Sequence, residues 1–454
     1  MRTSIQRLVA FAILTLVAAL SFGQDDPITT QRIIQEGKYR SQVMQLLKEL
    51  TDIGPRLTSS TNLEKAEQWA VGKFKSWGLS NVHLDKWGEF PVGFDRGKCT
   101  GGMTQPTARD FEFTTPSWTE GTHGRKEGEA INAPETMDEF NQVRSRLKGA
   151  WIVYKTPPRR QRRVRPGETP PPPTDEEKAA QALSDAIQNA GILGVIYGSN
   201  NDLCVTFGAY RDKTFEKHPT DVQIIIRHSD MMAIQEQLDA KKTVKLAFDI
   251  NQTFRKGPIS NYNVVADIPG TEHPDEYVIV SGHLDSWDGP GSQGALDNGT
   301  GSCTAMEAAR ILMASHAKPK RTIRFILWTG EEQGLLGSAG YVKVHPEELP
   351  KISAVLVDDG GTDYQGGYIG LESQREFFEK AFAPVVAAFP DMPETYTGGD
   401  RQQRPVGSDQ DTFNRLGVPG FFTVEKGRSN YGLVHHTQND RYDMAIPEYL
   451  AQSG

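Results

Sequence analysis

The chain has 454 residues, more than one compact core usually holds, so we expect two lobes or one domain with a large insertion. Charged residues make up 24% and hydrophobic residues 37%, a composition that excludes a fibrous or wholly disordered protein. The formal net charge of −8 gives no reason to expect a nucleic-acid partner.

Residues 1–23 have the pattern of a secretory signal peptide. Arg2 and Arg7 flank the start of an apolar run from Leu8 to Leu20, and Ser21-Phe22-Gly23 supplies small residues at the cleavage-site spacing. The run is shorter than the roughly 20 residues of a membrane-spanning helix, and no later segment is apolar enough to span. We therefore predict a secreted or periplasmic protein with no membrane contact after the signal is removed.

The segment from Pro27 to about Asn81 shows helical spacing of its apolar residues, which predicts two helices separated at Gly54-Pro55. Residues 99–250 instead predict short strands around one helix near residues 180–190, and we interpret them as an inserted β-rich domain. Residues 24–98 and 251–454 then form the N-terminal part and the main part of the remaining domain.

Residues 157–177, within the insertion, combine five arginines with the prolines 170–173. Such a composition cannot bury much apolar area, so it predicts a mobile surface loop rather than an anion-binding patch. The cysteines Cys99, Cys204 and Cys303 are too few and too widely spaced for a disulfide framework or a thiolate metal site. Pairing of Cys99 with Cys204 stays open.

After Asn261 strands and helices alternate. The pattern predicts strands at 264–268, 277–280, 323–327 and 354–357, with helices at 300–314 and from Gly337. This alternation indicates α/β layers around a mostly parallel or mixed sheet. Ligands of such folds bind at the carboxyl ends of the strands, which is where this chain has its polar residues.

The first strand end carries His283 and, two residues later, Asp285. Neutral imidazole is a zinc ligand, and a nearby carboxylate often fixes its tautomer, so Asp285 is a candidate for that role. Asp297 stands at the mouth of the next helix. It could simply cap that helix, but a carboxylate there can also bridge two cations about 3.5–4 Å apart.

The adjacent glutamates Glu331 and Glu332 follow the next strand. Such a pair can start a helix, but one carboxylate can also bind a metal while its neighbour accepts a proton from the attacking water. We assign Glu331 as the general base and Glu332 as a ligand. A further strand ends at Asp358-Asp359, and His435-His436 follow near the C-terminus. Together these residues form the ligand set that two zinc ions would take.

Four motifs resemble those of metallopeptidase family 28: Ser281 to Asp288, Ala295 to Gly299, Gly330 to Gly334, and His435-His436-Thr437. Gly54 to Thr58 and Trp77 to Val82 also match, so the resemblance covers most of the mature chain. It implies a three-layer α/β/α zinc-exopeptidase fold with a mixed central sheet, plus an inserted β-rich domain similar to protease-associated domains.

Carried over by position, the resemblance implies two Zn²⁺ per chain, the first held by His283, Asp297 and Asp359. The second ion would be held by Asp297, Glu332 and His436. Asp359 fits the family's Asp-x-Gly-Thr run better than Asp358, and His436 directly precedes Thr437 as the family's histidine ligand does. Glu331 would be the base, and His435 would support the oxyanion where many relatives have a tyrosine.

The implied function is hydrolysis of short peptides by an aminopeptidase- or dipeptidase-like exopeptidase, with a homodimer as an expected assembly. Asp409 is a candidate for reading a free amino terminus, although Ser408-Asp409 is equally typical of a turn. Two alternatives remain: a single-zinc acyltransferase of the glutaminyl cyclase type, and a metal-free receptor-like protein of the same fold. The intact set of ligands and base speaks against the receptor-like alternative.

Overall fold

The computed structural model describes residues 27–155 and 172–454. The predicted signal peptide and residues 157–171 of the predicted loop lie outside the described residues. The predicted end of the loop at residue 177 was wrong, because the helix α6 (Asp175–Gln188) already begins at Asp175. Thr174 and Glu177 form a capping box there, in which each side chain accepts a hydrogen bond from the other residue's backbone amide.

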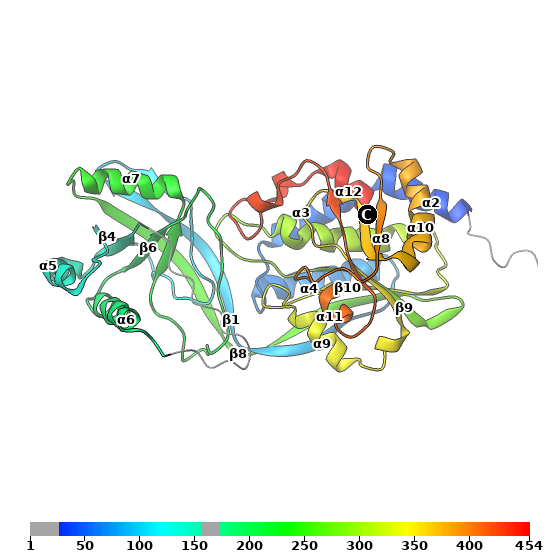
Figure 1. Cartoon of the computed structure of the whole chain (residues 1–454), viewed down its shortest axis with the longest axis horizontal. Helices are drawn as coiled ribbons and strands as arrows, with labels where there is room; N and C mark the ends of the chain where they lie inside the picture. Colours follow the sequence, from blue (N-terminus) through cyan, green and yellow to red (C-terminus); the bar gives the residue numbers. More distant parts are fainter. Residues whose placement is uncertain (1–26, 156–171) are drawn as a thin grey trace, which may run out of the picture.

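The chain forms two lobes connected by a long two-stranded ribbon (Figure 1). In this ribbon β1 (Ser80–Gln105) pairs antiparallel with β8 (Lys245–Ile268) from Ser80 to Gln105. Cys99 lies opposite Ile250, so the predicted domain limits at 99 and 250 fall at one point inside two continuous strands. The pairing of the two strands therefore extends from one lobe into the other, with register shifts such as the one between Arg96 and Cys99. The domain division stays a prediction.

The N-terminal segment forms three helices where the sequence predicted two: α2 (Pro27–Arg40), α3 (Val43–Ile53) and α4 (Thr61–Ser76). The additional break lies at Ser41-Gln42. The backbone N–H of Gln42 donates to Glu307 Oε1 at 2.8 Å, so a tertiary contact takes the amide that a continuous helix would use.

The first lobe contains the mixed sheet. Its strands run in the order β15 (Gly420–Phe422), β11 (Ile352–Val357), β9 (His273–His283), β10 (Arg321–Trp328) and β8. Neighbours from β15 to β10 are parallel, whereas β8 is antiparallel to β10. The mixed α/β fold expected from the sequence is thereby confirmed.

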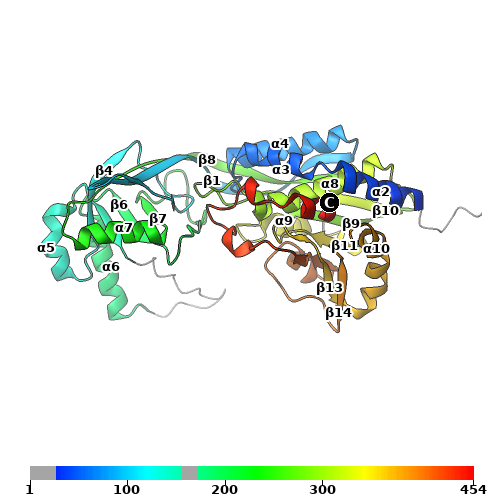
Figure 2. The same ribbon diagram turned by 90° about the horizontal axis from the view of Figure 1, so that it is seen from above.

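Helices cover both faces of this sheet because successive side chains of each strand point to opposite sides. Phe325 and Leu327 of β10 pack in the cluster formed with α3, α4 and α8 (Thr300–Ala314). Ile326 and Trp328 pack on the other face, which α9 (Leu336–Val344) and α11 (Gln410–Asn414) cover. Figure 2 shows α3 and α4 above the strands and α10 (Arg375–Ala388) below them.

The second lobe continues the same hydrogen-bonded sheet through β4 (Lys126–Asn132), β5 (Trp151–Tyr154), β6 (Gly194–Gly198) and β7 (Gln223–Ile226), which are mutually parallel. The short strands β2 (Arg109–Asp110) and β3 (Phe113–Thr114) lie at its edges. Because α5 (Met137–Leu147), α6 and α7 (His228–Asp239) accompany these strands, this lobe is α/β rather than mainly β.

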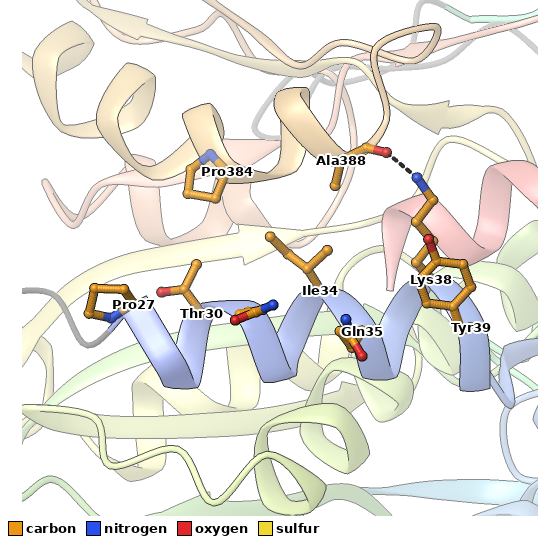
Figure 3. A pocket seen from close by; sticks show the side chains of 9 residues that line it. Pro27, Thr30, Ile34, Gln35, Lys38, Tyr39, Pro384 and Ala388 are labelled. Carbon is orange, nitrogen blue, oxygen red and sulfur yellow. Dashed lines mark hydrogen bonds between the residues drawn. The ribbon is translucent and has the colours of Figure 1, made fainter.

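The first lobe contains further short elements. They are the strand pairs β12 (Tyr364–Gln365) with β16 (Glu425–Lys426) and β13 (Gly367–Leu371) with β14 (Thr395–Gly399), and helix α12 (Pro447–Ser453). A pocket of about 540 Å³ lies between α2 and α10, lined by Ile34, Tyr39 and Pro384 among others (Figure 3). Lys38 donates to the carbonyl oxygen of Ala388 beside it.

No helix within residues 27–155 and 172–454 is both long and apolar enough to cross a membrane. Cys99, Cys204 and Cys303 are all free thiols, so the structure does not contain the pairing that the sequence left open.

The packing of β10 generates a stability prediction. Phe325 is fully buried, and replacing it with alanine should lower the free energy of unfolding by about 3–5 kcal/mol through lost apolar contact and a cavity. Phe377 is 77% exposed and provides the control, because Phe377→Ala should change that free energy by less than about 0.5 kcal/mol. Urea unfolding measures both, and equal losses would contradict the assignment of this core.

Candidate metal centre

Three parallel strands bring polar residues to one edge of the sheet. His283 ends β9 and lies opposite Trp328, the last residue of β10. Glu331 and Glu332 follow β10 within four residues, and Asp359 comes two residues after the end of β11. Because neighbouring parallel strands share the direction of their carboxyl ends, segments distant in the sequence meet at this edge.

Asp297 lies at the centre of the cluster. It lies in a kinked turn, Ala295–Gly299, at the entrance to α8, where its backbone dihedral angles are extended rather than helical (φ −121°, ψ 93°). Its side chain is almost completely buried. Its Oδ1 is 3.3 Å from Nε2 of His283, and its Oδ2 is 3.2 Å from Nε2 of His436. The two oxygens of one carboxylate thus face two different imidazoles, as a bridging carboxylate requires.

His283 is 1% exposed, and its Nε2 lies 3.2 Å from Oδ1 of Asp359. Its Nδ1 is 2.9 Å from the carbonyl oxygen of Asp285 and 3.6 Å from the nearer carboxylate oxygen of the same residue. A carbonyl oxygen can only accept, so Nδ1 carries a proton and Nε2 faces the acids. The backbone carbonyl of Asp285 therefore orients the ring. The sequence had suggested the carboxylate of Asp285 for this role.

His436 and Glu332 form the other side of the cluster, with 3.1 Å between Nε2 and Oε2. His436 has a positive φ of 59°, and its carbonyl oxygen accepts a hydrogen bond at 2.8 Å from the backbone N–H of Thr206. Thr206 belongs to the second lobe, which therefore helps to hold this histidine in place. The sequence contains no local signal for this contact, since the two segments are far apart along the chain.

His435 stacks on His436 with 3.7 Å between ring centres, and its Nε2 is 3.8 Å from Oδ2 of Asp297. Its side chain is about half exposed, and burial lowers its pKa, so the ring is neutral at neutral pH. Tyr431, whose ring centre is 5.2 Å from that of His435, was not singled out from the sequence. Burial and the nearby acids, Asp297 first, raise the pKa of its phenol well above the usual value, so it stays a hydrogen-bond donor.

The adjacent glutamates differ in environment. Glu332 is 3% exposed at its side chain, whereas Glu331 is 12% exposed, with Oε2 3.9 Å from Nε2 of His283. Burial raises the pKa of Glu331 well above its ordinary value, and His283 opposes this shift. The more accessible carboxylate is thus the one to which the sequence assigned proton transfer.

Two further acids lie near the centre without entering the cluster. Asp358 is paired with Glu425, and burial raises its pKa to about 6. Asp409 is fully buried beside α11, and burial raises its pKa to about 7. Neither of its carboxylate oxygens accepts a hydrogen bond from any described residue.

The donor set fits a divalent metal. Two groups of three residues each bring their ligand atoms within 4.8 Å of one another. The first group is His283, Asp297 and Asp359, and the second is Asp297, His435 and His436. Oε1 of Glu332 is buried and has no hydrogen-bond partner within the described ranges. Imidazole nitrogens and carboxylate oxygens are ligands of zinc and related ions, and a cation would compensate the concentrated negative charge.

Comparisons with known proteins agree with these motifs. Residues 263–453 match the model of peptidase family M28. Carboxypeptidase Q from Mus musculus is 28% identical over 425 residues, which cover 91% of this chain and 83% of the mouse protein. Carboxypeptidase Q from Homo sapiens is 28% identical over 421 residues with the same coverage. The family resemblance of the sequence motifs is thereby confirmed.

Two solved structures share the fold. A peptidase M28 precursor from Shewanella amazonensis has a TM-score of 0.62 at 24% identity, with 95% of both chains covered. A zinc aminopeptidase from Bacillus subtilis has a TM-score of 0.54 at 18% identity, covering 90% of this chain and 91% of that chain.

The charges around His436 generate a pH prediction for the metal-free protein. Burial lowers the pKa of His436, but Glu332 and Asp297 outweigh this effect and raise it from 6.5 to about 10. A raised histidine pKa contributes stability that is complete below pH 6.5 and is lost as the pH rises through about 10. The melting temperature of the metal-free protein should therefore fall over this window.

Thermal unfolding of chelator-treated protein across the same window measures the effect. His436→Gln is the control, because without this imidazole the metal-free protein should show a flatter pH dependence. A melting temperature that rises over the window would contradict the assigned charges.

Proposed function

We propose that this chain, whose residues 263–453 match the model of peptidase family M28, is a secreted, di-zinc exopeptidase acting on short peptides. The observation that carries the proposal is the carboxylate of Asp297, with one oxygen 3.3 Å from His283 and the other 3.2 Å from His436. The relatives named carboxypeptidase Q support an exopeptidase activity.

The first zinc ion would be held by His283, Asp297 and Asp359, and the second by Asp297, Glu332 and His436. When bound, the two ions would polarise the scissile carbonyl and lower the pKa of the attacking water.

Glu331 would accept a proton from the attacking water and then donate it to the leaving amine as the C–N bond breaks. Its partial exposure and its position beside His283 support this role. His435 would donate an N–H to the developing oxyanion, and its neutral ring near Asp297 suits that task.

The substrate would be a short peptide that the secreted enzyme hydrolyses outside the cytoplasm. The charged start, apolar run and small residues of the first 23 positions support secretion, and the family resemblance supports a peptide end as the reacting part. Asp409, buried and without a hydrogen-bond partner among the described residues, stays a candidate for reading a free amino terminus.

A metal count combined with a dipeptide panel tests the proposal. Metal-depleted and zinc-restored protein would be assayed on unblocked and N-acetylated dipeptides and on a peptide with N-terminal glutamine. We expect two zinc ions per chain and zinc-dependent cleavage. One zinc with cyclisation of the glutamine peptide would favour the acyltransferase alternative, and failure to bind zinc or to turn over any peptide would favour the receptor-like one.

Substitution of the adjacent glutamates separates proton transfer from metal binding. Glu331→Gln should keep both zinc ions and lower kcat by about 100- to 10,000-fold, the usual contribution of a general base. The matched variant Glu332→Gln should lose zinc, because it removes a proposed ligand. Zinc content and steady-state kinetics check both expectations, and activity near wild type in Glu331→Gln would remove this residue from the mechanism.

A further inference from the structure

Arg56 is a fully buried arginine in the connection between α3 and α4, outside the residues that match the family model. Its guanidinium donates to three backbone carbonyl oxygens: Nε to Leu284 at 2.6 Å, Nη1 to Gln293 at 3.0 Å and Nη2 to Gly294 at 2.7 Å. All three acceptors lie in residues 284–296, the segment that connects His283 to Asp297.

The three bonds join the two ends of this segment. Leu284 directly follows His283, and Gly294 precedes Asp297 by three residues. The backbone of Arg56 makes two more contacts, because its N–H donates to Oγ of Ser286 and its carbonyl accepts from the Ser286 N–H, both at 3.0 Å. One residue therefore links the strand end that carries the first histidine to the turn that carries the shared carboxylate.

The surroundings of the buried charge of Arg56 support a role beyond ordinary packing. None of the ion pairs between described residues includes Arg56, so its buried charge is met by carbonyl dipoles and, at longer range, by acids of which Asp440 is the strongest. Burying a cation without a direct carboxylate partner is costly. A neutral side chain could fill the space, but it could not donate to three carbonyls in fixed directions.

We propose that Arg56 is a positioning residue that sets the separation of His283 and Asp297 before metal binds, and thereby strengthens metal binding. The inference rests on the proposed function in taking these two residues as ligands. A residue with a general stabilising role would affect the whole fold, whereas Arg56 should affect the conformation of residues 284–296 and the affinity for metal.

Arg56→Lys tests this role. Lysine keeps the positive charge but donates from a single nitrogen, which cannot reach both ends of the segment. We expect zinc to bind about 10- to 100-fold more weakly, the usual effect of losing a group that orients metal ligands. Competition with a chromogenic chelator measures this affinity without any peptidase assay.

Arg310→Lys is the matched control. Arg310 is also buried, but it pairs with Glu36 and Glu307 near the far end of α8. The zinc affinity of Arg310→Lys should stay within about twofold of wild type, because Arg310 contacts none of the proposed ligands and distant sites act independently. A folded Arg56→Lys protein that binds zinc as tightly as Arg310→Lys would overturn the proposal.

Hydrogen exchange in the wild-type protein provides a second test that does not depend on the variant folding. If Arg56 organises the segment before metal binds, the backbone N–H groups of residues 284–296 should be as protected from exchange without metal as with zinc. Protection that appears only after zinc is added would overturn the proposal. If wild-type protein binds no zinc, the proposed function fails, while exchange in the metal-free protein still decides the role of Arg56.

Discussion

The candidate centre requires positive charge, because Asp297 and the acids beside it are largely buried. His283 and His436 each face one oxygen of this carboxylate, while Asp359 and Glu332 add further acid beside them. Carboxylates in such surroundings persist only if they are protonated or paired with positive charge. The raised pKa of His436 reflects this negative charge, because in the absence of metal a proton on the imidazole supplies the compensating positive charge. A divalent cation meets the same demand more completely, because it accepts electron pairs from several donors at once.

The sheet brings these donors together because its central strands are parallel. Both faces of the strands are covered by helices, so alternate side chains such as Phe325 and Ile326 are buried on opposite sides. The interior of each strand is therefore apolar, and the polar residues lie just beyond its end. The apolar packing that stabilises the fold thereby also determines where His283 leaves the sheet.

The family-matched part of the chain does not build this centre alone. Arg56, from the N-terminal helices, holds the segment between His283 and Asp297, and Thr206, from the second lobe, holds the backbone of His436. The pairing of β1 with β8 ties the second lobe to the sheet that carries the other donors. Residues from both lobes therefore hold the candidate centre.

The sequence by itself determined the alternation of strands and helices after Asn261, the limits of α8, and the motifs that contain His283, Asp297 and Glu331. These features are local, because apolar periodicity and the residue types at strand ends are written in consecutive positions. Only the tertiary structure decided that the Asp285 carbonyl orients His283, that Asp358 turns to Glu425, and that Gln42 interrupts the first helix. It also revealed the contacts of Arg56 and Thr206. Each of these depends on which backbone or side-chain atom a distant segment presents, and hydrogen bonds between segments far apart in the chain leave no periodic signal in the sequence.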